Sequence, residues 1–73
     1  SQSTALTRRV MEQLAGGSYA VLRNVECFEQ EGRIVLRGSV PSFFLKQMAQ
    51  SIVAKVPGVA TVDNQLVVDD HRK

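Results

Sequence analysis

The start of the chain has the hydrophobic spacing of an amphipathic helix. Its apolar positions recur every four residues at Leu6, Val10 and Leu14, and Met11 lies on the flank of this stripe. Ser3 or Thr4 can cap the start of this helix, and Gly16-Gly17 is a strong stop signal. The spacing therefore predicts a helix of about 12 residues. Residues 18–24 contain apolar side chains without a clean period, so no element is assigned to them.

Two short runs of alternating polar and apolar residues come next. Residues 25–29 alternate, residues 30–32 have turn composition, and residues 33–38 alternate again. This arrangement predicts a β-hairpin in which Gly32 supplies a positive φ. The second run divides into one buried face and one partly wet face, formed by Ile34 and Leu36 and by Arg33, Val35 and Arg37, respectively.

A second amphipathic helix follows Pro41, with Ser42 as its expected N-cap. Its apolar stripe keeps helical spacing and consists of Leu45, Met48, Ala49, Ile52, Val53 and Val56. Pro57-Gly58 ends this helix sharply. We expect the start of the helix, at Phe43, to stand outside the apolar stripe and beside Lys46.

The last element is a strand over residues 60–68 with one apolar face, formed by Val62, Leu66 and Val68. Asn64 falls on that same face, although an inward amide is costly unless it is hydrogen-bonded. We therefore expect Asn64 to tie the strand to a neighbouring loop or to mark a bulge.

The order helix, strand, strand, helix, strand predicts an α+β fold. We expect an αββαβ two-layer sandwich, in which two helices pack on one face of a three-stranded mixed sheet. The third strand should run parallel to the second and most simply beside it, and an edge position next to the first strand is the alternative. The expected core comprises Leu6, Val10, Leu14, Ile34, Leu36, Met48, Ala49, Ile52, Val62, Leu66 and Val68.

Length and composition favour one small domain. The 73 residues are 44% hydrophobic with a net charge of +2, so wholesale disorder is not expected. We expect a single domain over residues 1–73, with its core at 4–68 and a polar tail at 69–73. Its apolar runs are far shorter than the roughly 18 residues that cross a bilayer. The chain opens on polar residues without an initiator Met, so we expect an excised domain or mature fragment.

The hairpin, second helix and last strand together resemble a BON domain, a small αββαβ module found mostly in bacterial envelope proteins. The resemblance rests on Gly32, Ile34, Leu36, Gly38, Val40, Ser42, Lys46, Ala49, Ile52, Val56, Gly58-Val59, Val62, Asn64, Leu66 and Val68. The chain departs from the family pattern at Phe43-Phe44-Leu45, where such domains usually carry polar or charged residues. The resemblance implies a non-catalytic module that binds phospholipid or attaches envelope proteins to membranes and partners. It also implies a location in the bacterial cell envelope or periplasm.

Nothing in the sequence favours catalysis, a cofactor or a metal. His71 is the single histidine and lies in the polar tail, and Cys27 is the single cysteine, which we expect to be inert and partly buried. No phosphate-binding glycine motif occurs. The Gly-x-x-Gly loop of KH-type RNA binders is absent, as is aromatic interleaving. We therefore expect neither an enzyme nor a nucleic-acid-binding protein.

A set of basic residues and one aromatic residue are the candidate lipid-binding positions: Arg8, Arg9, Arg23, Phe43 and Lys46. The arginines would attract anionic phospholipid weakly, while Phe43 enters the interface and Lys46 meets phosphate. The alternatives are that Phe43 packs on the sheet or on residues 18–24 and that the arginines serve solubility. A protein–protein interaction module of a larger envelope protein, without lipid contact, is the competing function.

Overall fold

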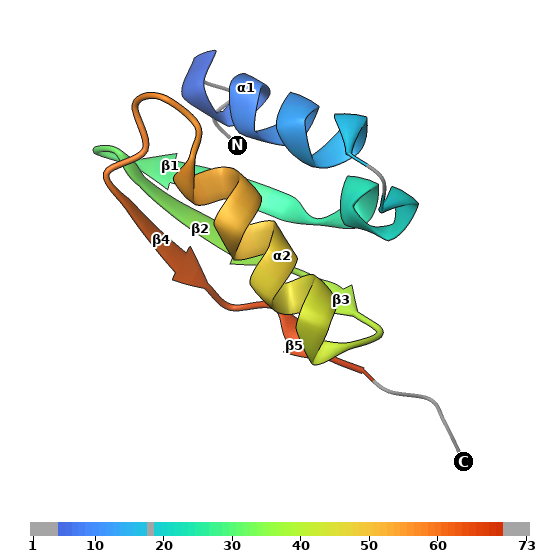
Figure 1. Cartoon of the computed structure of the whole chain (residues 1–73). Coiled ribbons are helices and arrows are strands. Elements are labelled where there is room, and N and C mark those ends of the chain that lie inside the picture. The colour runs from blue at the N-terminus through green and yellow to red at the C-terminus, as the bar shows by residue number, and fades with distance from the viewer. Residues whose placement is uncertain (1–4, 18, 70–73) are drawn as a thin grey trace.

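A computed structural model describes residues 5–17 and 19–69 (Figure 1). Its elements are α1 (Ala5–Gly16), the 3-10 helix η1 (Ala20–Asn24), β1 (Glu26–Gln30), β2 (Arg33–Arg37), β3 (Ser39–Val40), α2 (Phe43–Ala54), β4 (Thr61–Asn64) and β5 (Val67–Val68). The predicted first helix is confirmed with 12 residues. The proposed caps Ser3 and Thr4, and the tail from residue 70 with His71, lie outside the described residues.

The predicted hairpin is present, with β1 antiparallel to β2 and Gln30 opposite Arg33. The two residues between these partners, Glu31 and Gly32, have φ values of 54° and 83°. A tight two-residue hairpin turn of this kind requires a positive φ at both residues. Gly32 adopts its positive φ without a side-chain clash, because glycine has no Cβ. The Gly32 N–H also donates to Glu29 Oε2 at 2.7 Å, so the turn is closed by a side chain of β1.

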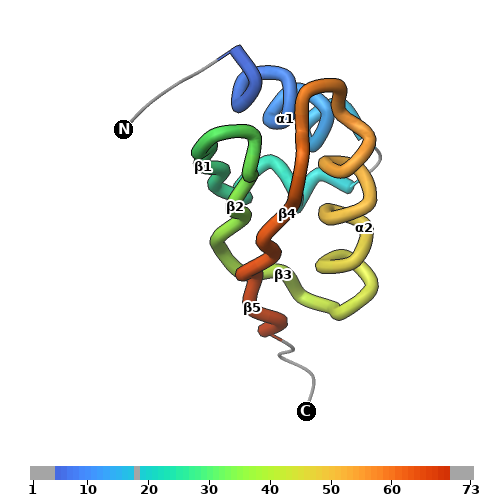
Figure 2. The backbone as a smooth tube through the Cα atoms, turned by 90° about the vertical axis from the view of Figure 1, so that its left-hand side faces the viewer, coloured from blue at the N-terminus to red at the C-terminus, as the bar shows by residue number. Residues whose placement is uncertain are grey.

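The passage through α2 brings β4 beside β2. Ser42 caps α2 as predicted, because its Oγ accepts a hydrogen bond from the Leu45 N–H at 3.3 Å. After α2 the chain returns as β4, which pairs parallel to β2 and gives the order β1-β2-β4. The three-stranded mixed sheet is therefore confirmed with the third strand next to the second, and the alternative position beside β1 is wrong. Figure 2 shows α1 and α2 on the same side of this sheet.

The last strand does not run unbroken from residue 60 to 68. It divides into β4 and β5, and β5 pairs with β3 in a separate two-stranded parallel sheet. The partner strand bends at Gly38, whose φ of 129° is disfavoured for L-residues with a side chain. The expected single sheet therefore becomes two, joined through the bend at Gly38 and the break after Asn64.

Asn64 holds this break together. Its Nδ2 donates to the backbone carbonyl of Lys46 at 2.9 Å and to Gln50 Oε1 at 3.2 Å, and its Oδ1 accepts from the Leu66 N–H at 3.1 Å. The inward amide is therefore hydrogen-bonded, as predicted, but its partner across the core is helix α2 rather than a loop. The turn made by Oδ1 lets Leu66 enter the core beyond the strand end.

The core is more widely spread than the sequence predicts. Of the expected residues, the fully buried ones are Val10, Leu14, Ile34, Leu36, Ala49 and Leu66, and the half-buried ones are Leu6, Met48, Ile52, Val62 and Val68. Further buried positions are Thr7, Leu22, Val25, Val40, Val53 and Val56. Leu22 was missed because η1 occupies the stretch without a period, where a 3-10 turn brings this one side chain under α1.

Replacing Leu36, which is 0% exposed at the centre of the sheet, with Ala should lower the free energy of unfolding by about 2–5 kcal/mol. The loss comes from removed apolar contacts and from the cavity left behind. Urea denaturation of the variant and the wild type measures it. Val67→Ala is the matched control, because Val67 is 60% exposed and its truncation should change stability by less than about 0.5 kcal/mol.

Replacing Asn64 with Ala should destabilise the domain by about 1–3 kcal/mol, because the Lys46 carbonyl and the Leu66 N–H lose their shared partner. Asn64→Asp should cost less at neutral pH than Asn64→Ala, since the carboxylate still accepts from Leu66. Equal denaturation midpoints for wild type and Asn64→Ala would show that these bonds do not matter to stability.

Candidate functional site

The structure places the five candidate lipid-binding residues on three elements. Arg8 and Arg9 are exposed on α1, and Arg23 is exposed on η1. Phe43 is the first residue of α2 and is 59% exposed. Lys46 lies one turn further along α2 and is half-buried, so its side chain is less accessible than those of the arginines.

These five residues do not form one patch. The start of α1 lies against the C-terminal end of α2, because Arg9 Nη1 donates to the Pro57 carbonyl at 3.4 Å and Leu6 packs beside Gly58. Phe43 and Lys46 lie toward the opposite end of α2. A helix rises about 1.5 Å per residue along its axis, so Phe43 and Pro57 lie roughly 20 Å apart along the axis of α2. Arg9 and Phe43 can therefore touch a common surface only if that surface lies flat along the helices.

The aromatic pair at the start of α2 divides between two environments. Phe44 packs edge-on against Tyr19, with ring centroids 5.8 Å apart and an interplanar angle of 75°. The alternative for Phe43 was packing on the sheet or on residues 18–24, and the ring contact with Tyr19 of that segment is made by its neighbour Phe44. Phe43 has no such ring contact among the described residues and stands out from the start of the helix.

Charge is distributed unevenly between the two layers. Helices α1 and α2 with the C-cap of α2 carry four basic residues against one acidic residue, namely Arg8, Arg9, Lys46 and Lys55 against Glu12. The hairpin and β4 carry the reverse excess, with Glu26, Glu29, Glu31 and Asp63 against Arg33 and Arg37. Sequence reasoning missed Lys55 as a candidate, since only the packing of α1 against α2 brings it to the side where Arg9 lies, at a groove over Ile52 and Val56.

On the face of the sheet that the helices leave uncovered, a basic and an acidic side chain pair with each other. Arg33 and Asp63 form an ion pair across β2 and β4 at 2.5 Å. The hydrogen bond from Arg33, together with a second from Gln65, lowers the pKa of the Asp63 carboxyl below its ordinary value. Its lowered folded pKa means that any stability the pair gives is present at neutral pH and is lost as the solution is acidified through that pKa. Phe28, 43% exposed, lies on this face beside Val35.

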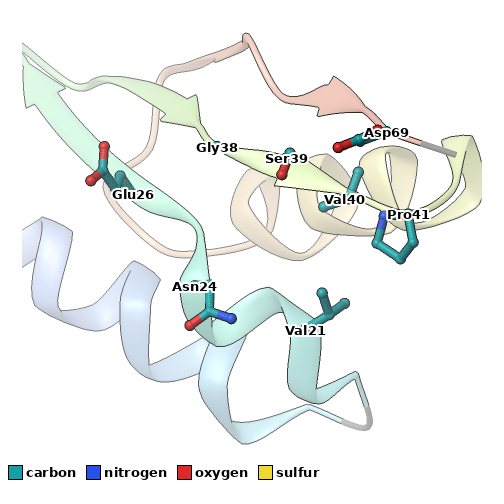
Figure 3. A pocket seen from close by; sticks show the side chains of 8 residues that line it. All are labelled: Val21, Asn24, Glu26, Gly38, Ser39, Val40, Pro41 and Asp69. Carbon is teal, nitrogen blue, oxygen red and sulfur yellow. The ribbon is translucent and has the colours of Figure 1, made fainter. Parts of the chain in front are cut away.

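A separate cleft opens where the two sheets diverge (Figure 3). It has a volume of about 570 Å³ and lies between the η1–β1 segment and β3. Val21, Val40 and Pro41 contribute apolar walls, and Glu26 and Asp69 are its charged lining residues. Among the residues that the structure describes, no basic side chain lines this cleft, so its described lining does not favour an anionic headgroup.

The described residues offer no preformed metal site and no membrane-crossing helix. They contain no group of three or more His, Cys, Asp or Glu side chains that could hold a metal ion. Within the same described ranges, none of the helices has the length and apolar character that a bilayer span needs. Cys27 is half-buried in β1, and this burial raises the pKa of its thiol to about 11.

Comparison with known proteins agrees with the architecture. The family model of the BON domain matches residues 2–70, nearly the whole chain, and the chain belongs to this family. BON domains are non-catalytic modules. A search of curated proteins found no match.

The raised pKa of Cys27 predicts slow alkylation. At pH 8 the folded thiol should react with iodoacetamide roughly a hundredfold more slowly than in the guanidinium-unfolded chain, because a pKa of about 11 leaves little thiolate. The rate should rise as the pH approaches that pKa. A matched control is Phe28→Cys in a Cys27→Ser background, which puts an exposed thiol on the same strand. Equal rates for Cys27 in the folded and unfolded chains would contradict the prediction.

Proposed function

We propose that this BON domain is a non-catalytic module that attaches weakly to anionic phospholipid surfaces, with its helical layer facing the lipid. The observation that carries the proposal is the charge difference between the layers. The basic excess lies on α1, α2 and the C-cap Lys55, whereas the acidic excess lies on the strands and the hairpin turn. The family resemblance supports action in the bacterial cell envelope or periplasm.

The geometry favours a flat orientation of the helices on the membrane. Arg8 is exposed on α1 and Lys55 is exposed at the C-cap of α2, so both side chains can reach a surface that rests along the helices. Arg9 lies between α1 and α2, where its guanidinium is still exposed. A membrane resting along both helices would meet these three cations and, near the other end of α2, Phe43.

The expected affinity is low. Each basic residue near an anionic surface contributes about 1 kcal/mol, so Arg8, Arg9 and Lys55 together supply about 3 kcal/mol, to which Arg23 adds where it reaches the same surface. A free energy of about 4 kcal/mol corresponds to a dissociation constant near 1 mM. Lys46 was expected to contact a lipid phosphate. Because its side chain is half-buried, it contributes less binding free energy than an exposed lysine would. Stable attachment of a larger protein would therefore need several such modules or another anchor.

The competing function is a protein-interaction module without lipid contact. One observation favours it, which is the cleft beside β3 with its carboxylate lining. The two functions use different faces of the domain, so one variant set can distinguish them.

Arg8→Gln should weaken binding to phosphatidylglycerol vesicles about fivefold, because one cation that faces the lipid contributes roughly 1 kcal/mol. Co-sedimentation at low salt measures the bound fraction, with phosphatidylcholine vesicles as the neutral comparison. Arg37→Gln is the matched control, since it removes the same charge from an exposed position on the sheet. It should change binding little. Equal effects of both variants would contradict the orientation.

Binding should also fall steeply as salt shortens the Debye length from about 10 Å at 0.1 M to about 3 Å at 1 M. Phe43→Ser should leave low-salt binding largely intact and reduce the part that survives in high salt, because an apolar contact is not screened. Failure of the folded wild type to bind strongly anionic vesicles at low salt would overturn the lipid proposal as a whole.

A further inference from the structure

Strand β3 has one unpaired edge. Its partner β5 takes one side, where the Val67 N–H donates to the Gly38 carbonyl at 2.9 Å and the Asp69 N–H to the Val40 carbonyl at 2.7 Å. Successive residues of a strand direct their backbone groups to opposite sides. The N–H and C=O of Ser39 therefore face away from β5, and no strand of the described chain pairs with β3 on that side.

This edge opens directly onto the cleft of about 570 Å³. The cleft exists because β1 stays paired with β2 only as far as Glu26 and Arg37, after which Gly38 turns the chain away from β1. In Figure 3, Val21 rises from η1 on one side and Ser39 and Pro41 lie on the other. The space next to Ser39 is thus lined by apolar Val21 and Pro41 and by polar Asn24, and the free backbone donor and acceptor of Ser39 lie at its edge.

The charge of the cleft selects the kind of occupant. Glu26 lies at the start of β1 and lines the cleft, and none of the lining residues within the described ranges is basic. Arg37, the register partner of Glu26, is not among the lining residues. A bound segment with a positive side chain beside its backbone would therefore gain a favourable charge interaction that an acidic segment would lose.

We propose that the cleft binds an extended peptide segment of a partner protein, which adds as a strand to the free edge of β3 and directs a Lys or Arg side chain to Glu26. In strand addition, main-chain hydrogen bonds provide affinity and alternate side chains provide specificity. Here Ser39 contributes the donor and acceptor, and Val21 and Pro41 contact the side chain that faces inward. β3 has only two residues, so a short peptide binds weakly and the partner gains affinity from additional contacts.

The test uses the whole 73-residue chain and a capped five-residue peptide of threonine and valine with one central lysine. Amide shifts are followed by NMR as the peptide is added to millimolar concentration. We expect the largest shifts at Ser39, Val21 and Glu26, with none on α1. Two control peptides carry glutamate in place of lysine or N-methyl groups on the central backbone nitrogens, and both should bind markedly more weakly.

The protein variants separate this site from a general charge effect. Glu26→Lys should weaken binding of the lysine peptide about fivefold or more, because it replaces one favourable charge pair with a repulsion. Glu31→Lys makes the same charge change at the hairpin turn, at the other end of β1, and should have little effect. Absence of shifts around Ser39, equal binding of the N-methylated peptide, or equal effects of the two variants would each overturn the proposal. None of these outcomes bears on vesicle binding.

Discussion

The side chain of Asn64 is the interaction on which the division of this fold depends. Its Nδ2 donates to the backbone carbonyl of Lys46 in α2, and its Oδ1 accepts from the Leu66 N–H just past the end of β4. A short polar side chain therefore joins helix, strand end and the segment leading to the second sheet. Leu66 can enter the core there because its backbone donor already has a partner. Together with the bend at Gly38 in the partner strand, this link places the break between the two sheets directly after β4.

The sequence predicted those parts of the fold that depend on periodicity and strong stop signals. The two helices, the hairpin with its turn at Gly32, and the parallel placement of the last strand follow from spacing, glycine and proline positions and the geometry of crossover connections. Periodicity could not predict the break between β4 and β5, because residues 60–68 keep their alternation across it. The break arises from tertiary contacts of Asn64 and from the backbone bend at Gly38. Similarly, Leu22 is buried through a 3-10 turn that has no period of its own.

The candidate site was predictable by residue type but not by arrangement. The arginines on the first amphipathic helix led to the hypothesis of an anionic surface without reference to the fold, yet their distance from Phe43 depends on how α1 crosses the end of α2. Lys55 joins Arg9 only through that crossing. The cleft beside β3 had no sequence signal, because its walls come from η1, β1 and β3, and the gap between them results from the bend at Gly38.

The open edge of β3 also affects whether copies of the domain associate with one another at high concentration. An unpaired strand edge is a template on which further copies of the same chain can assemble, and proteins restrict this by making edges short and by placing proline and charge next to them. Both devices are present here, since β3 has two residues, Pro41 follows directly, and Glu26 lies across the gap. Two identical cleft rims would each bring a carboxylate, so a second copy meets repulsion. We therefore expect this short edge to be a poor site for pairing between two copies of the domain.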